Sequence, residues 1–242
     1  MNSHLSSVPY FDHYARDNDL SPSGRKFVWP YFRKLYRPLL PADHDAHLLD
    51  FGCGTGTLLE WLHSEGYKSA EGIDTDRSQI AFAEKLNVNA RWVPNSTEWL
   101  KGGGPYKAIF LTDVLEHIPD DSDHETLCCL YDALAPGGIL IVKVPNANSS
   151  FAARARYLDP THRRVYTEEL LRCALDAAGF CDVRTMPDDV WMPRSAKEAV
   201  AVCMRFGFRA LRRLEAITEF GMPAAKWPLS HNVIGIGCRP SR

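Results

Sequence analysis

Hydrophobic and polar positions follow two different repeats along most of this chain. Short apolar runs bounded by glycine, proline or polar residues predict strands, and apolar residues three and four positions apart predict helices. The expected strands are 47–51, 69–74, 90–93, 107–112, 139–144, 181–184 and 232–237. The expected helices are 25–40, where Pro30 disturbs the pattern, 57–65, 77–86, 123–134, 167–178 and the amphipathic segment 195–217.

The expected strands and helices alternate from residue 47 to residue 144, and this order implies a parallel sheet with helices on both faces. Right-handed crossovers between the strands make such a sheet doubly wound. Residues 145–165 are predicted to be a loop with a basic cluster, Arg154, Arg156, Arg163 and Arg164. The fold class that follows from this pattern is α/β.

Length and charge narrow the class of protein. A chain of 242 residues fits one α/β domain with appendages. The 28 basic and 30 acidic residues give a net charge of -2, which provides no overall basic field for binding nucleic acid. No apolar run reaches the roughly 20 residues that span a bilayer, and residues 1–5 lack the features of a secretion signal. We therefore expect a cytoplasmic protein that does not bind nucleic acid.

The cysteines also agree with a cytoplasmic protein. There are seven of them, an odd number, and none belongs to a C-x-x-C pair. This pattern argues against a disulfide framework and against a structural zinc site. Acidic residues and asparagines do not stand at a spacing typical of a metal site either, so the sequence predicts no metal.

The turn after the first expected strand carries three glycines at alternate positions, Gly52, Gly54 and Gly56. An apolar run precedes them and a helical pattern follows, which is the context that a nucleotide-binding glycine loop requires. Glycine permits positive φ and lets a ligand lie against bare backbone. Many strand-to-helix turns need glycine for chain reversal alone, so the residues that follow decide between the two interpretations.

Asp74 ends the second expected strand, where an acidic residue accepts hydrogen bonds from ribose hydroxyls in nucleotide-binding folds. The alternative is that Asp74 or Asp76 caps the next helix, and Asp76 is the better placed of the two. A glycine loop followed by an acidic residue also suits NAD. The spacing here, however, is G-x-G-x-G rather than G-x-G-x-x-G.

Four segments resemble, in the right order, the motifs of class I S-adenosylmethionine (SAM)-dependent methyltransferases. Residues 49–56 look like the first motif, 72–76 like the second, 113–118 like the fourth, and 134–138 like the segment before the fifth strand. The resemblance covers residues 45–185, and the last expected strand fits the family's closing strand. It implies a Rossmann-like, seven-stranded, mostly parallel sheet with an antiparallel last strand, and SAM as the cofactor.

The resemblance also implies where the cofactor lies. The glycine loop would approach the methionine and ribose, Asp74 would take the ribose diol, and Asp113 would lie beneath the methionine end. The Asp that reads adenine in many relatives is replaced here by Ser96, preceded by Asn95, so one of these side chains or the backbone must substitute. The residues expected at SAM are Tyr14, Gly52, Cys53, Gly54, Gly56, Asp74, Thr75, Asn95, Ser96, Asp113 and Leu115.

The same resemblance suggests a division of the chain. Residues 1–40 would form a helical extension that folds over SAM as a lid, and 41–242 the methyltransferase domain, with 145–165 and 186–230 as substrate-covering insertions. The aromatic residues that resemble such a lid are Tyr10, Phe11 and Tyr14. Ordinary packing of an N-terminal helix is the alternative for these aromatic residues.

Two histidines are candidates for a catalytic base, because methyl transfer to a neutral hydroxyl benefits from a group that titrates near neutral pH. His117 follows the fourth expected strand, and His162 lies in the loop after the fifth. Each has a structural alternative. His117 would then begin a helix, and His162 would tether its loop to the sheet.

A finer resemblance concerns the acceptor. Segments 144–146, 156–157, 161–162, 166–170 and 178–180 are similar to bacterial methyltransferases of surface-polysaccharide and other glycan biosynthesis. This similarity implies a sugar hydroxyl as acceptor and favours His162 as the histidine near that hydroxyl. The basic cluster could bind phosphate or carboxylate groups of a sugar nucleotide or lipid-linked glycan, and the residues expected at the substrate are Arg156, Tyr157 and Arg163. A solvated basic face is the alternative for these arginines.

The sequence therefore predicts a SAM-dependent O-methyltransferase that acts on a sugar or glycan hydroxyl. The alternatives are a methyltransferase of small molecules such as quinones, phenols or natural products, and a SAM-binding interaction module without catalysis. The basic and apolar segment 195–217 would rest on an anionic membrane surface, or pack on the domain or on a partner subunit in a homodimer.

Overall fold

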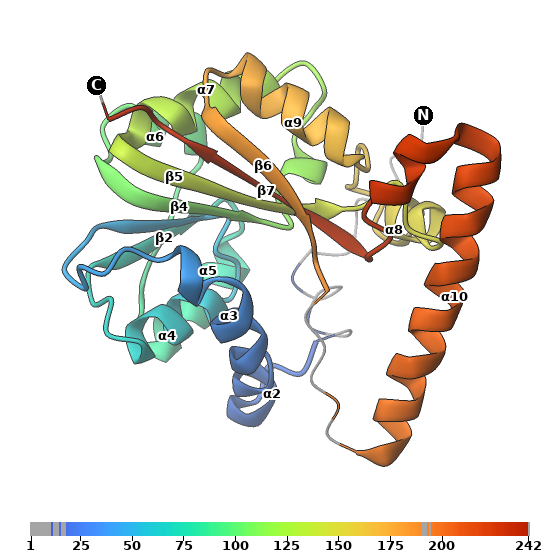
Figure 1. The fold of residues 1–242 in the computed structure, drawn as a ribbon. Coiled ribbons are helices and arrows are strands. Elements are labelled where there is room, and N and C mark those ends of the chain that lie inside the picture. The colour runs from blue at the N-terminus through green and yellow to red at the C-terminus, as the bar shows by residue number, and fades with distance from the viewer. Residues whose placement is uncertain (1–10, 12–14, 16–17, 190–192, 194, 242) are drawn as a thin grey trace.

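A computed structural model describes residues 11, 15, 18–189, 193 and 195–241. Its seven described strands form one sheet in the order β3-β2-β1-β4-β5-β7-β6. Strands β1 to β5 run parallel, and β7 runs antiparallel to β5 and β6 (Figure 1). The strands are β1 (Leu48–Phe51), β2 (Ala70–Asp74), β3 (Asn89–Trp92), β4 (Tyr106–Thr112), β5 (Leu134–Pro145), β6 (Cys181–Pro187) and β7 (Asn232–Cys238). The predicted doubly wound sheet with an antiparallel last strand is confirmed.

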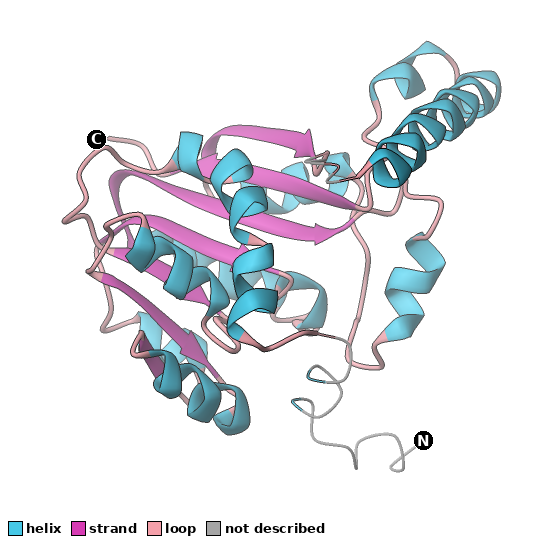
Figure 2. Cartoon of the chain, turned by 90° about the horizontal axis from the view of Figure 1, so that it is seen from below, coloured by secondary structure: helices cyan, strands magenta, loops and turns pink. Residues whose placement is uncertain are grey.

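Helices cover both faces of this sheet (Figure 1, Figure 2). On one face lie α2 (Pro22–Phe27), α3 (Trp29–Leu35), α4 (Thr57–Ser64) and α5 (Arg77–Ala83). On the other lie α6 (Ser96–Leu100), α7 (Asp123–Ala133) and α9 (Glu168–Ala177). The remaining described helices are α8 (Ala152–Leu158), α10 (Ala196–Phe220) and the short turns η2 (Arg37–Leu39), η3 (Glu84–Leu86), η4 (Leu115–His117) and η5 (Met222–Lys226).

Alternate residues of β1 belong to two hydrophobic cores, one on each face of the sheet. Leu49 and Phe51 pack in the core with α7 and α9, whereas Leu48 packs with Trp61 of α4. All four side chains are buried, and full burial of one such side chain contributes about 1.5–3 kcal/mol. The two cores therefore hold the central strands, and with them the loops at their carboxyl ends, in fixed positions.

Two local predictions were wrong, and one short helix was missed. Residues 25–40 do not form one helix, because α2 ends at Phe27 and Pro30 lies in the first turn of α3, where its missing N–H costs nothing. The expected loop 145–165 contains the helix α8. The short helix α6 was not expected, and Asn95 caps it by accepting a hydrogen bond from the Glu98 N–H.

Helix α10 differs from every other described α-helix, because none of its 25 residues is buried. It stands beside the body of the molecule, and η5 packs against it (Figure 1). Arg209 of this helix forms an ion pair with Asp189. Among the described helices, none is long and apolar enough to cross a membrane.

Candidate functional site

A cavity of about 1640 Å³ opens at the carboxyl ends of the parallel strands. Its walls come from the loops after β1, β2, β3 and β4, from the end of β5, and from residues 18–32. Ligands of open α/β sheets bind at this edge, where neighbouring strands lead to opposite faces. Typical small-molecule sites measure about 300–1,000 Å³. This cavity is therefore large enough for a nucleoside cofactor and a second small molecule together.

The glycine turn between β1 and α4 forms one wall of the cavity. Gly52 and Gly54 have φ values of +79° and +52°, and a side chain at Gly54 would place its Cβ 2.6 Å from Gln79 Oε1. The N–H groups of Gly52 and Cys53 both donate to the Ile73 carbonyl, at 2.8 and 3.0 Å. These bonds fasten the turn to β2 and leave its backbone exposed to the cavity.

Asp74 faces this turn from the end of β2. Its Oδ2 accepts a hydrogen bond from the Gly54 N–H at 2.9 Å, and its Oδ1 accepts one from the Asp76 N–H at 2.8 Å. The cap of α5 is Asp76, which accepts from the N–H groups of Ser78 and Gln79. Helix capping is therefore not the role of Asp74. Each of its carboxylate oxygens has further lone pairs for a ligand in the cavity.

A second carboxyl group lies beneath the turn. Asp50 is only 3% exposed and lines the floor of the cavity. Burial, together with the nearby charge of Asp74, raises the pKa of Asp50 to about 8. Burial also raises the pKa of Asp74, but the backbone N–H groups of Asp76 and Gly54 oppose this shift. At neutral pH Asp50 is therefore mostly a protonated acid that can donate a hydrogen bond, and Asp74 is the acceptor.

An ion pair lines the cavity beside β4 and β5. Lys143 Nζ lies 2.7 Å from Asp113 Oδ2; Lys143 lies near the end of β5, and Asp113 directly follows the neighbouring strand β4. Burial lowers the pKa of Lys143, but Asp113 and the neighbouring Tyr31 and Tyr36 outweigh it, so the pKa lies well above its usual value. Asp113 has φ +55°, a conformation that non-glycine residues adopt where the surroundings impose it.

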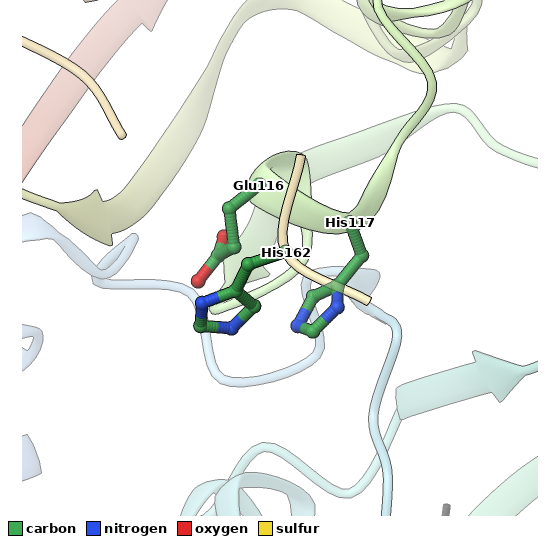
Figure 3. Close-up of side chains that lie close together, drawn as sticks. All are labelled: Glu116, His117 and His162. Carbon is green, nitrogen blue, oxygen red and sulfur yellow. The ribbon is translucent and has the colours of Figure 1, made fainter. Parts of the chain in front are cut away.

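Two histidines and a glutamate lie close together (Figure 3). Glu116 and His117 belong to η4, and His162 comes from the loop after α8. The rings of His117 and His162 are 4.6 Å apart, and Thr161 Oγ1 lies 2.7 Å from His117 Nδ1. Burial and the charge of His162 lower the pKa of His117, and burial raises the pKa of Glu116, which is 1% exposed. Of the three residues, His117 lines the cavity.

Comparison with known proteins decides the family. A family model described as a methyltransferase domain matches residues 25–185. The chain belongs to this family. The crystal structure of a SAM-dependent methyltransferase from Archaeoglobus fulgidus superposes with a TM-score of 0.67, at 21% identity, over 96% of this chain and 100% of that one. The methyltransferase domain thus has the fold that its motifs predicted.

Two curated relatives match part of the methyltransferase domain. The ubiquinone biosynthesis O-methyltransferase of Caulobacter sp. (strain K31) is 30% identical over 115 residues, which cover 45% of this chain and 44% of that protein. The trans-aconitate 2-methyltransferase of Variovorax paradoxus (strain S110) is 30% identical over 128 residues, covering 51% of this chain and 44% of that protein. The chain therefore matches less than half the length of these relatives.

These findings separate the alternatives that the sequence left open. Membership of the family favours SAM over NAD as the ligand of the glycine turn. The finer resemblance to glycan methyltransferases receives no support, since the names of both relatives describe methyltransferases of small molecules. The small-molecule alternative is therefore better supported than the glycan interpretation.

Most residues that the sequence placed at SAM line the cavity of the methyltransferase domain. Those that do are Gly52, Cys53, Gly54, Asp74, Thr75, Asn95, Ser96 and Asp113. Two residues do not line the cavity: Gly56 is the N-cap residue of α4, and Leu115 is buried in the core with α7. Tyr10 and Tyr14 lie outside the described residues, whereas the ring of Phe11 lies 6.2 Å from that of Phe82 in α5.

The residues expected at the acceptor do not line this cavity. Arg156 and Tyr157 belong to α8, and the guanidinium of Arg156 lies 5.2 Å from the centre of the Tyr157 ring. Tyr157 is 78% exposed, and Arg163 is also exposed. Arg164 of the same basic cluster pairs with acidic residues of the preceding loop and α7, Asp120 and Asp123. The roles of Arg156, Tyr157 and Arg163 remain predictions.

Sequence reasoning missed three polar residues of the site, Asp50, Glu116 and Lys143. Each stood in a segment already singled out: Asp50 within the first motif, Glu116 beside His117, and Lys143 inside the apolar run 139–144. A charged residue within an apolar strand can indicate a site residue, because a charged side chain is rarely buried without a partner of opposite charge. The partner of Lys143, Asp113, is one of the residues that the sequence predicts at SAM.

Proposed function

We propose that this chain transfers the methyl group of SAM to a small-molecule acceptor. The observation that carries the proposal is one continuous cavity with two chemically different walls. The glycine turn and Asp74 form one wall, and Asp113, Lys143 and His117 form the other. The membership of the methyltransferase family and the names of the two relatives support the same reaction class.

SAM would lie along the first wall. The two hydroxyls of its ribose would donate to Asp74, whose carboxylate is already oriented by two backbone N–H groups. The adenine would lie toward Asn95 and Ser96. Because Asn95 Oδ1 already accepts from Glu98 and Thr97, Ser96 or the backbone is better placed to meet the adenine amino group.

The acceptor would enter at the second wall. In the reaction a lone pair of the acceptor oxygen forms the new O–CH₃ bond as the C–S bond breaks, and the C–S electrons neutralise the sulfonium. S-adenosylhomocysteine leaves, and the hydroxyl proton has to go to the protein or to water. Holding oxygen, methyl and sulfur in line accounts for much of such a rate enhancement. Proton removal would take place at the end of the cavity that His117 lines.

Of the two candidate histidines, His117 is therefore the one that would meet the acceptor. His162 lies behind it, with its Nδ1 2.6 Å from the Ala155 carbonyl oxygen. The sequence favoured His162 for contact with the acceptor. The position of the cavity favours His117 for this contact and a supporting role for His162.

Acceptor-dependent release of S-adenosylhomocysteine tests this proposal. The chain is incubated with SAM and panels of hydroxylated aromatic compounds, small carboxylic acids and sugars, and the product is measured by mass spectrometry. Turnover with an aromatic or carboxylate acceptor supports the small-molecule assignment, and turnover confined to sugars contradicts it. SAM binding without turnover on any panel would favour the interaction module.

Helix α10 bears on partners rather than on the reaction. Its exposed apolar side chains are Val200, Met204, Phe206, Phe208, Leu211, Leu214 and Phe220. Peripheral membrane contact and a homodimer through 195–217 remain predictions, as does the cytoplasmic location. Sedimentation velocity with and without anionic vesicles distinguishes a dimer, a membrane-bound form and a monomer.

A further inference from the structure

Glu116, His117 and His162 form a cluster whose potential ligand atoms, one from each side chain, all lie within 4.8 Å of one another (Figure 3). Transition-metal ions bind imidazole nitrogen and carboxylate oxygen at about 2.0–2.2 Å. Two donors on opposite sides of one ion are therefore at most about 4.4 Å apart. The widest pair of the cluster, no more than 4.8 Å apart, exceeds that limit by at most about 0.4 Å.

Hydrogen bonds fix the tautomer of His117. The hydroxyl of Thr161 donates its single proton to Asp159 Oδ1 at 2.6 Å, and the Thr161 N–H donates to the same oxygen at 2.7 Å. Thr161 Oγ1 must therefore accept the bond from His117 Nδ1, which carries the proton. In the neutral ring the lone pair then lies on Nε2.

His162 has the same tautomer for a different reason. Its Nδ1 lies 2.6 Å from the Ala155 carbonyl oxygen, which can only accept, so Nδ1 carries the proton and Nε2 the lone pair of the neutral ring. Histidines that bind metals almost always donate their other ring N–H to a carboxylate, a backbone carbonyl or a water molecule. His162 donates directly to a carbonyl, and His117 is connected through the Thr161 hydroxyl to the carboxylate of Asp159. Both rings of the cluster are therefore oriented as metal ligands are.

Glu116 supplies an independent observation. It is 1% exposed, and its Oε2 is a buried oxygen with no hydrogen-bond partner among the described residues. An unpaired buried carboxylate oxygen costs free energy unless a proton or a cation compensates it. In Figure 3 the carboxyl group of Glu116 points toward the ring of His162. A cation between these side chains would satisfy the orphaned oxygen.

We propose that Glu116, His117 and His162 bind a divalent transition-metal ion at the acceptor end of the cavity. Two imidazoles and one carboxylate suit manganese, iron, cobalt or zinc better than magnesium, which prefers oxygen ligands throughout. This proposal replaces the prediction from the sequence that no metal binds. Acidic residues and asparagines at a typical spacing would have indicated such a site in the sequence, whereas this cluster combines Glu116 with two histidines 45 positions apart in the chain.

A metal ion held here would lower the pKa of an acceptor hydroxyl that it binds. Its site borders the cavity, since both His117 and Thr161 line the cavity wall. The use of the ion in methyl transfer rests on the proposed function, whereas ion binding itself rests on the cluster alone. The two can therefore be tested separately.

Cobalt binding by the full chain, prepared without an affinity tag and stripped with chelator, tests the site. Co²⁺ is titrated and followed by its visible ligand-field absorption and by the melting temperature. We expect one Co²⁺ per chain with nitrogen and oxygen ligands, without the near-ultraviolet charge-transfer band of a thiolate site, and a higher melting temperature. SAM binding by the same samples is measured by calorimetry.

Two ligand variants and two comparison variants sharpen the test. Glu116→Gln and His162→Ala should abolish the absorption and the thermal shift, and Thr161→Val should weaken binding about 10- to 100-fold, as loss of a supporting hydrogen bond does at other metal sites. His47→Ala should bind Co²⁺ as the natural chain does, because His47 is exposed and precedes β1 at the opposite edge of the sheet.

Failure of this proposal is distinct from failure of the proposed function. If the natural chain takes up no Co²⁺, or if Glu116→Gln and His162→Ala bind it unchanged, the metal site is wrong, whatever the chain does with SAM. Melting of the metal-free variants near the natural temperature shows that they fold. If the natural chain binds Co²⁺ but does not bind SAM, the proposed function is contradicted and the metal site is not.

Discussion

The carboxylate of Asp74 accepts two backbone hydrogen bonds and lies on the wall of the cavity. If it also accepts the ribose hydroxyls of SAM, Asp74→Ala removes hydrogen bonds to a charged group, each of which contributes about 1.5–3 kcal/mol. We expect the dissociation constant of SAM, measured by calorimetry, to rise at least tenfold, which corresponds to a loss of about 1.4 kcal/mol of binding free energy. Asp45→Ala, an exposed carboxylate outside the cavity, is the matched control and should bind SAM normally. Equal affinities of both variants would remove the ribose role of Asp74.

Asp50 makes the stability of the protein depend on pH. Its pKa is about 8 in the folded state and near the ordinary value of 3.8 in the unfolded chain, so the folded state holds this proton more tightly. The stability that Asp50 contributes is complete below pH 3.8 and is lost as the pH rises toward 8. The loss is on the order of several kcal/mol.

The variant Asp50→Asn isolates this effect, because it keeps the shape of the side chain and cannot ionise. Urea unfolding between pH 5 and pH 8.5 should show the natural chain losing stability with rising pH relative to Asp50→Asn. Parallel pH profiles for the two chains would show that Asp50 ionises normally in the fold.

At the scale of elements, the glycine turn tolerates side chains least, because its backbone has positive φ and its neighbours are close. Gly54→Ala places a Cβ 2.6 Å from Gln79 Oε1 and keeps an alanine at φ +52°, which costs about 1–2 kcal/mol. We expect a lower melting temperature and weaker SAM binding. Gly207→Ala is the matched control in α10, where an added Cβ meets nothing within 4 Å. That substitution should stabilise the helix by about 0.5–1 kcal/mol, and a destabilised Gly207→Ala would contradict the helix as described.

Elements with a complete hydrophobic repeat could be predicted from the sequence. Strands β1, β2 and β4 are apolar and buried, so their residues alone indicate strand, and Gly52 and Gly54 indicate the turn. Helix α8 could not be predicted, because of its seven residues only Ala155 is buried and an exposed helix leaves little apolar repeat. In the sequence, Pro30 looks like a disturbance within one helix. In the structure it lies in the first turn of a second helix, α3, which begins after the end of α2.

At the scale of the whole molecule, the site depends on the order of the strands. Asp113 and Lys143 are 30 positions apart in the chain, and the pairing of β4 with β5 brings them into contact. His117 and His162 follow these same two strands, so the same pairing brings their rings together. The sequence identified both histidines separately. Their contact required the register of β4 against β5 and the path of the loop after α8, and local patterns contain neither.

Binding of SAM to the natural chain is the most direct measurement of what this cavity does. In an isothermal titration we expect one SAM per chain, displacement by S-adenosylhomocysteine, and no heat of binding with NAD. A chain that binds NAD in place of SAM, or that binds neither nucleotide, would contradict the assignment of the glycine turn and Asp74 to the methyl donor.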